Sequence, residues 1–179
     1  TISEELLTSA GNSGIIINST SSGTGSLIHN SPDVPGTIYR YVTGSSTLTA
    51  KSYHTVSVPL TQAANPVSGL FLGSYLYEFD ASGQQWNSLG TPTNTPLSVD
   101  EGYLMYYPDA STTYSFAGPM NNGVFDAAEM SSTSGHYQLV PNPYPSAIDW
   151  DASSGWTKTN LNDAIWIWSS SDGNWAAYG

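Results

Sequence analysis

The sequence predicts an all-β protein with a β-sandwich or jelly-roll-like architecture. Helix signals are almost absent, and the best of them is Ser3–Leu7, where Ser3 is placed to cap a single turn. Elsewhere, short runs rich in Val, Ile, Thr and aromatic residues alternate with clusters of Gly, Pro, Asn, Asp and Ser. Many short strands separated by turns favour a sandwich or jelly roll, with a β-solenoid as the second possibility.

Strands are expected along most of the chain. They cover Gly14–Asn18, Ser26–His29, Thr37–Thr43, Tyr53–Val58, Tyr75–Phe79, Gln85–Leu89, Gly102–Tyr107, Thr113–Ala117, Tyr137–Val140, Ala164–Trp168 and Asn174–Tyr178. The first two are typical of short rungs of a parallel β-coil or of an edge sheet, and the proline-bearing turn Ser31–Gly36 follows them. We therefore expect an N-terminal β segment over residues 1–36, a first β unit over 37–134 and an incomplete second β unit over 135–179.

An internal repeat links the two β units. His54–Pro59 reads HTVSVP and His136–Pro141 reads HYQLVP, which share His, Val and Pro at the same spacing. Ser74–Gly90 aligns without gaps on Asp163–Gly179. The matched pairs are Tyr77 with Trp166, Phe79 with Trp168, Trp86 with Trp175 and Gly90 with Gly179. Each window reads as an aromatic hairpin with a Ser/Gly/Asp turn, so the chain is predicted to contain two copies of one β unit.

The second unit lacks counterparts of the strands that follow the hairpin in the first unit. The first unit continues through Thr91–Met120, whereas the second ends at Gly179, the equivalent of Gly90. A β unit without these strands leaves backbone groups unpaired. We expect other protein chains, or downstream segments of the same polypeptide, to complete it by β-strand pairing, so that the protein belongs to an assembly or fibre. The alternative is that strands of the first unit serve both copies.

Charge excludes several classes of partner. Three basic residues stand against 14 acidic ones, which gives a net charge of -11. Nucleic-acid binding needs Lys and Arg to displace counterions from phosphates, and docking on anionic membranes needs them too. No stretch approaches the roughly 20 apolar residues of a bilayer-spanning helix. We therefore expect no nucleic-acid partner and no membrane insertion. A charged fraction of only 9%, with polarity from Ser, Thr, Asn and Gly, favours an extracellular or cell-surface location.

One segment has a recognisable pattern. Asn142–Asp151 (NPYPSAIDWD), with Gly155–Trp156 and Ala164–Trp168, resembles a segment common in large surface and secreted proteins of the Bacteroidota. Such proteins often leave the cell through the type IX secretion system. The first unit is similar to the same pattern, with YRYV at Tyr39–Val42 followed by HTVSVPL. The resemblance implies an exported location and a modular, repetitive architecture, but it does not imply a defined molecular function.

Asp residues near this segment are the candidate metal ligands. Asp149 and Asp151 could supply oxygen ligands to calcium, as Asp-rich loops of extracellular β modules do. The alternative is that both cap turns through side-chain-to-backbone hydrogen bonds. No D-x-D-x-D-G ladder is present, so turn capping is favoured and no cofactor is expected.

The aromatic residues have two competing interpretations. Six Trp and twelve Tyr could form a sugar-binding platform, because aromatic faces stack on flat ligands. Matched positions in two copies instead favour core packing, which is the expectation for Tyr77, Phe79, Trp86, Trp166, Trp168 and Trp175. Trp150 is also expected to pack inward. Trp156, in a Gly-Ser loop, is the candidate exposed, ligand-binding aromatic residue.

Catalytic patterns are absent from the sequence. His54 and His136 recur one per copy, as structural residues would. There is no cysteine, no G-x-S-x-G elbow and no H-E-x-x-H motif. Glu78 and Asp80 have Ile167 and Ser169 as their repeat equivalents, so nothing marks them as a catalytic pair. No enzymatic activity is expected.

These observations predict a non-catalytic cell-surface or secreted module with a structural or adhesive role. The main alternative is a carbohydrate-binding module of a secreted polysaccharide-active protein, and a small hydrolase is the third. Exposed Trp rings would favour the carbohydrate-binding alternative, whereas carboxylates that face each other across a cleft would favour the hydrolase.

Overall fold

The computed structural model describes residues 14–44, 52–61, 68–90, 96–107, 109–126, 133–159, 161 and 164–178. Its elements are β1 (Ile15–Ile17), β2 (Ser19–Thr20), β3 (Gly23–Thr24), β4 (Pro35–Val42), β5 (Tyr53–Val56), the 3-10 helix η4 (Ser68–Phe71), β6 (Tyr75–Asp80), β7 (Gln85–Ser88), β8 (Tyr103–Tyr106), β9 (Thr112–Pro119), β10 (Ile165–Ser169) and β11 (Asn174–Tyr178). The all-β class is confirmed. The helical turn expected at Ser3–Leu7 lies outside the described residues.

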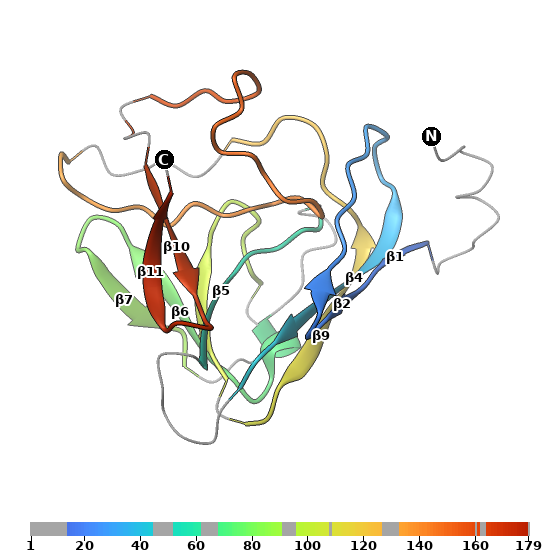
Figure 1. The fold of residues 1–179 in the computed structure, drawn as a ribbon, viewed down its shortest axis with the longest axis horizontal. Helices are drawn as coiled ribbons and strands as arrows, with labels where there is room; N and C mark the ends of the chain where they lie inside the picture. Colours follow the sequence, from blue (N-terminus) through green and yellow to red (C-terminus); the bar gives the residue numbers. More distant parts are fainter. Residues whose placement is uncertain are drawn as a thin grey trace.

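Two larger sheets and two hairpins make up the fold (Figure 1). The three-stranded sheet has the order β1-β4-β9, with β1 parallel and β9 antiparallel to β4. The four-stranded sheet has the order β5-β8-β6-β7 and is antiparallel throughout. The β2–β3 and β10–β11 hairpins each form a separate two-stranded sheet. In Figure 1 the β10–β11 hairpin lies at the same end of the molecule as β5, β6 and β7.

Alternating sequence patterns explain the central pair of the three-stranded sheet. Along β9, Tyr114 and Phe116 are buried, whereas Thr113, Ser115 and Ala117 are exposed. Successive side chains of a strand point to opposite faces, so this pattern gives β9 one apolar face. The facing strand β4 places Ile38 opposite Phe116, and both are buried.

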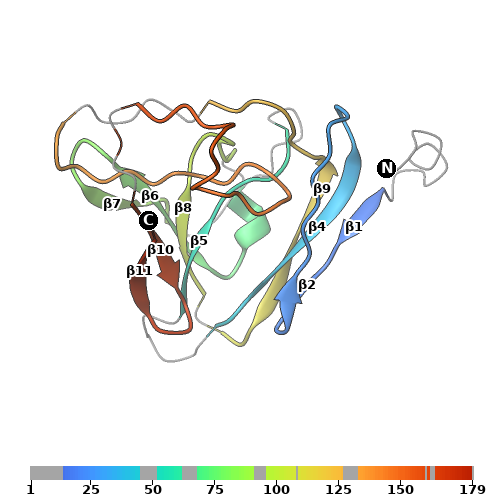
Figure 2. The ribbon, with the colours of Figure 1, turned by 45° about the horizontal axis from the view of Figure 1, so that its top comes forward.

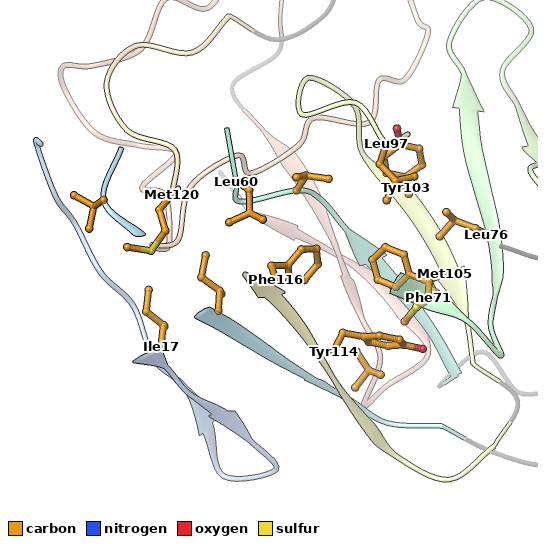
Figure 3. Packing of buried hydrophobic residues seen from close by; sticks show 14 residues of the cluster. Ile17, Leu60, Phe71, Leu76, Leu97, Tyr103, Met105, Tyr114, Phe116 and Met120 are labelled. Carbon is orange, nitrogen blue, oxygen red and sulfur yellow. The ribbon is translucent and has the colours of Figure 1, made fainter. Parts of the chain in front are cut away.

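The hydrophobic core takes residues from both larger sheets (Figure 3). Phe116 comes from β9 and Met105 from β8, and Leu60 and Phe71 come from segments between strands. Ile17, from β1, belongs to the same cluster. The predicted segment boundary at residue 36 lies within β4. The division into three segments stays a prediction, and so does the β-sandwich or jelly-roll architecture.

The predicted strand Ser26–His29 is not a strand. Its backbone bonds instead to the loop that contains Pro145: Leu27 N–H donates to the Pro145 carbonyl at 3.3 Å. Ser26 Oγ also accepts a bond from the Ala147 N–H at 3.2 Å. These contacts with a distant loop replace a strand ladder.

The predicted strand Tyr137–Val140 is also wrong. The N–H and the carbonyl of Tyr137 bond a side-chain amide rather than another strand. Gln84 Oε1 accepts from the Tyr137 N–H at 2.7 Å, and Gln84 Nε2 donates to the Tyr137 carbonyl at 3.0 Å. A primary amide presents one acceptor and two donors, so it satisfies an extended peptide unit without a neighbouring strand.

Within the described ranges, no helix has the length and apolar character that a membrane crossing requires.

Candidate functional site

The two predicted hairpins have the same register. Phe79 is paired with Trp86 across β6–β7, and Trp168 is paired with Trp175 across β10–β11. The ring centroids are 5.0 Å apart in the first pair and 5.2 Å apart in the second. The hairpin predictions at 74–90 and 163–179 are thus confirmed for the residues that the structure describes. The first motif, HTVSVP, supplies three residues of β5 and continues past its end, but HYQLVP does not form a strand. The duplication of a whole unit therefore stays a prediction.

The prediction that all matched aromatic residues lie in the core is wrong. Trp86, Trp166 and Trp175 have 36%, 45% and 41% of their surface exposed. Tyr77, Phe79 and Trp168 are half-buried. The physical reason is topological: β7 is an edge strand and β10–β11 is a separate two-stranded sheet, so among the described strands no second sheet covers these rings.

A groove with a volume of about 1630 Å³ lies against these two hairpins. Its lining residues come from β5, from both hairpins and from the loop that begins near residue 133. Figure 2 shows the ribbons of β5, β6, β7, β10 and β11 together at one end of the molecule. Its aromatic lining consists of Phe79, Trp86, Tyr137, Trp150, Trp166, Trp168, Trp175 and Tyr178. Ligand sites are typically concave and rich in aromatic side chains, with a few polar groups that fix orientation. This groove is therefore the candidate site.

The polar lining of the groove is almost uncharged. The amides of Gln84, Gln138 and Asn142 line it together with several Ser and Thr residues. Asp149 is the only carboxylate in the described lining, which contains no Lys or Arg. The buried Nε2 of Gln138 has no hydrogen-bond partner within the described part of the chain. A buried donor of this kind is costly to leave unpaired.

Two side chains of the β10–β11 hairpin bond one backbone carbonyl of β5, the edge strand of the four-stranded sheet. Trp168 Nε1 and Ser170 Oγ both donate to the Tyr53 carbonyl, each at 2.7 Å. Ser170 Oγ also lies 3.0 Å from Nδ1 of His54, whose Nε2 donates to the Thr43 carbonyl at 2.7 Å. Burial lowers the pKa of His54, which favours its neutral form, while the Thr43 bond acts in the opposite direction.

The part of the groove lining that begins near residue 133 is tied to the turn of the β6–β7 hairpin. His136 Nδ1 donates to the Ala81 carbonyl at 3.1 Å, and Gln84 bonds both backbone groups of Tyr137. Gln84 has a left-handed backbone with a φ of 53°, and its repeat equivalent, Gly173, has a φ of 66°. Sequence reasoning missed Gln84, although its alignment with a turn glycine was an available signal.

Residues of the segment Asn142–Asp151 line the groove. Asn142 Oδ1 accepts from the Tyr144 N–H at 3.0 Å, which closes a local turn. The Asn142 carbonyl accepts from Ser57 Oγ at 2.7 Å, and Asn121 Nδ2 donates to the Pro143 carbonyl at 2.8 Å. These bonds attach the loop to the residues after β5 and after β9, so the loop forms a fixed wall of the groove.

Trp150 packs inward as predicted, with 5% of its surface exposed. Its ring centroid lies 4.9 Å from that of Trp156, and Lys158 Nζ lies 4.3 Å from the centre of the Trp150 ring. Trp156 Nε1 donates to the Asp149 carbonyl at 2.6 Å. Trp156 is half-buried in this cluster and does not line the groove, so its ligand-binding role stays a prediction.

Asp149 and Asp151 are engaged in local hydrogen bonds. Asp149 Oδ1 accepts from the Asp151 N–H at 3.1 Å, which is the predicted turn-capping arrangement. Asp151 bonds the Tyr178 hydroxyl, and this bond together with the Asp151 charge raises the pKa of Tyr178. Among the described residues, no group of three or more His, Cys, Asp or Glu side chains is placed to hold a metal ion.

Comparison of the chain with protein-family models, curated proteins and solved structures gave no match.

Proposed function

We propose that this protein is a non-catalytic, extracellular adhesive module that binds neutral glycans in the aromatic groove. The observation that carries the proposal is the exposure of Trp86, Trp166 and Trp175 beside one groove. Rings in this position can stack on the apolar faces of sugars, and the neighbouring amides can bond sugar hydroxyls. Carbohydrate binding, which the sequence offered as the main alternative, is the means of adhesion in this proposal.

Charge favours neutral over anionic glycans. No Lys or Arg is present in the described lining, and the whole chain has a net charge of -11. Uronate or sulfate groups would be repelled by this field and would find no cation to pair with. The carboxylate Asp149 stands alone in the described lining, whereas most glycosidases use two carboxylates on either side of the bond that breaks. We therefore propose binding without hydrolysis.

A glycan-binding assay tests this function. The intact chain is applied to arrays of neutral and anionic polysaccharides, and binding to at least one neutral β-glucan, mannan or xylan is expected. Replacing Trp86 with Ala is expected to weaken that binding about tenfold, which corresponds to about 1.4 kcal/mol. The fold is expected to persist in this variant, because Trp86 is too exposed to contribute as a fully buried core residue does.

The matched control is Tyr75→Ala. Tyr75 is an exposed aromatic residue of the same hairpin, but it does not line the groove. Its replacement should leave glycan binding unchanged. Binding to anionic glycans alone, release of reducing sugars, or equal losses in both variants would contradict the proposal.

The β10–β11 hairpin supports a second candidate function, assembly through strand pairing. This hairpin is a two-stranded sheet within the described chain, and every residue of β11 is exposed. Its only charged residue is Asp172, in the turn, so charge repulsion at the strand itself is weak. Unpaired strand edges readily pair with another strand. The proposed occupant is the β11 strand of a second copy, in an antiparallel arrangement.

Sedimentation velocity tests this assembly. Dimers are expected at high protein concentration, and more of them at high salt, because salt screens the repulsion between two chains of net charge -11. Replacing Ala176 with Lys places a charge on the exposed β11 strand and should abolish the dimer, because charged side chains on an edge strand oppose strand pairing. Ser22→Lys, in the turn between β2 and β3, serves as a control for an added charge elsewhere. A monomer at all concentrations would exclude self-pairing.

A further inference from the structure

We infer that the groove is a composite site for a linear chain of several sugar units, with each hairpin contacting a different part of that chain. This inference rests on the proposed glycan-binding function and specifies its ligand class. It follows from the way in which the two hairpins are placed, from the rings that they present and from the size of the groove.

Equivalent rings from two hairpins line the same groove. Phe79 and Trp86 form the pair on the first hairpin, and Trp168 and Trp175 form the pair on the second, at the same strand register. A single sugar unit would use one such pair. A linear glycan presents the same chemical surface at each sugar unit, so it can contact both aromatic pairs.

The two hairpins are attached by reciprocal contacts. His54, in the first unit, contacts Ser170, the first turn residue of the second hairpin. His136, its counterpart in the second unit, contacts Ala81, the first turn residue of the first hairpin. Both contacts are made by Nδ1. Each hairpin is thus fixed at the first residue of its turn, by His54 against the Ser170 hydroxyl and by His136 against the Ala81 carbonyl. Both aromatic pairs are therefore held in place beside the groove.

The size of the groove agrees with an extended ligand. Sites for compact small molecules usually measure about 300–1,000 Å³. The volume here, about 1630 Å³, is larger than this range. The groove therefore has room for more than one sugar unit between its two aromatic pairs.

The test is isothermal titration calorimetry with cello-, manno- and xylo-oligosaccharides of one to six units. Affinity is expected to rise at least tenfold from the disaccharide to the hexasaccharide in the series that binds. Trp86→Ala and Trp175→Ala should each weaken hexasaccharide binding about tenfold. Tyr75→Ala should not, and circular dichroism of every variant verifies that the fold is retained.

The outcomes separate this inference from the proposed function. If a mono- or disaccharide binds as tightly as the hexasaccharide, or if only one of the two Trp replacements weakens binding, the composite site is wrong while glycan binding stands. If no sugar or polysaccharide of any length binds, the proposed function fails and this inference fails with it.

Discussion

At the scale of single residues, Gln84 is the most informative position. A left-handed backbone costs a non-glycine residue roughly 1–2 kcal/mol, and the equivalent turn position in the second hairpin is Gly173. The side chain of Gln84 compensates by bonding the Tyr137 N–H and carbonyl, so a strained backbone is retained where it fixes a groove wall.

Replacing Gln84 with Gly is predicted to separate two effects of this residue: backbone strain, which acts on stability, and attachment of the Tyr137 loop, which acts on glycan binding. The side chain of Gln84 makes three hydrogen bonds, two to Tyr137 and one to the Ala81 carbonyl. Relief of the strain offsets only part of the loss of three bonds of about 0.5–1.5 kcal/mol each, so the free energy of unfolding should fall by about 1–2 kcal/mol. Glycan affinity should fall, because the loop that contains Tyr137 loses its attachment. Urea unfolding and calorimetry measure the two quantities.

Two control variants sharpen this prediction. Gln84→Asn keeps a residue that tolerates the left-handed region but shortens the side chain, so it should bind glycans as weakly as Gln84→Gly. Gly173→Gln introduces the strain without an equivalent attachment and should destabilise the fold by about 1–2 kcal/mol. Unchanged glycan affinity in Gln84→Gly would show that the attachment has no role in the site.

At the scale of elements, the β10–β11 hairpin depends on its attachment to β5. An isolated two-stranded hairpin is at best marginally stable in water. Here Trp168 and Ser170 secure it at the Tyr53 carbonyl, and His54 lies against Ser170. The stability of this hairpin is thus coupled to the protonation state of His54.

Acidification is predicted to weaken the His54 contribution. Because burial lowers its folded-state pKa, the unfolded chain binds the proton more tightly than the folded chain. The associated stability is complete above the ordinary His pKa of about 6.5 and is lost as the pH falls from there through the lowered folded value. Urea unfolding midpoints measured between pH 8 and pH 5 should therefore fall more for the native chain than for His54→Gln.

The control for this measurement is His29→Gln. His29 bonds the Ser31 carbonyl at 3.0 Å, in the segment between β3 and β4. This variant should keep the pH dependence of the native chain. Parallel curves for the native chain and His54→Gln would contradict the predicted coupling.

Most strands could be predicted from sequence because their patterns are local. Alternation over Thr37–Thr43 and Thr113–Ala117 located β4 and β9 to within two residues at either end. Tyr137–Val140 has an equally good pattern, but a side-chain amide 53 residues away takes its first backbone bonds. Local patterns contain no information about such a partner, so this strand was predicted wrongly.

The candidate site was less predictable than the fold. The alignment of Trp86 with Trp175 correctly identified equivalent hairpin positions, but large aromatic residues are usually buried and core packing was inferred. Their exposure depends on β10–β11 remaining a separate sheet, which is a property of the tertiary arrangement. Trp150 was predicted correctly because its burial arises within its own loop, against Trp156 and Lys158.

At the scale of the whole molecule, one apolar core and one aromatic groove divide the aromatic residues between them. Inside the core, the Phe71 ring contacts those of Tyr114 and Phe116, with ring centroids 5.0 and 6.0 Å away. The tryptophans of the two hairpins lie outside it. Core packing and the proposed glycan contact therefore involve different aromatic residues, so variants of the hairpin tryptophans can be studied in a chain that keeps its core.

The reciprocal histidine contacts also have a kinetic consequence. His54 and Ser170 are 116 residues apart, and His136 and Ala81 are 55 residues apart. Contacts between such distant residues require the closure of long loops, which slows folding. The sheets that form the core can assemble before the last hairpin docks, whereas both walls of the groove require it. We therefore expect a refolding chain to acquire its buried core first and its ability to bind a ligand only in a later, slower step.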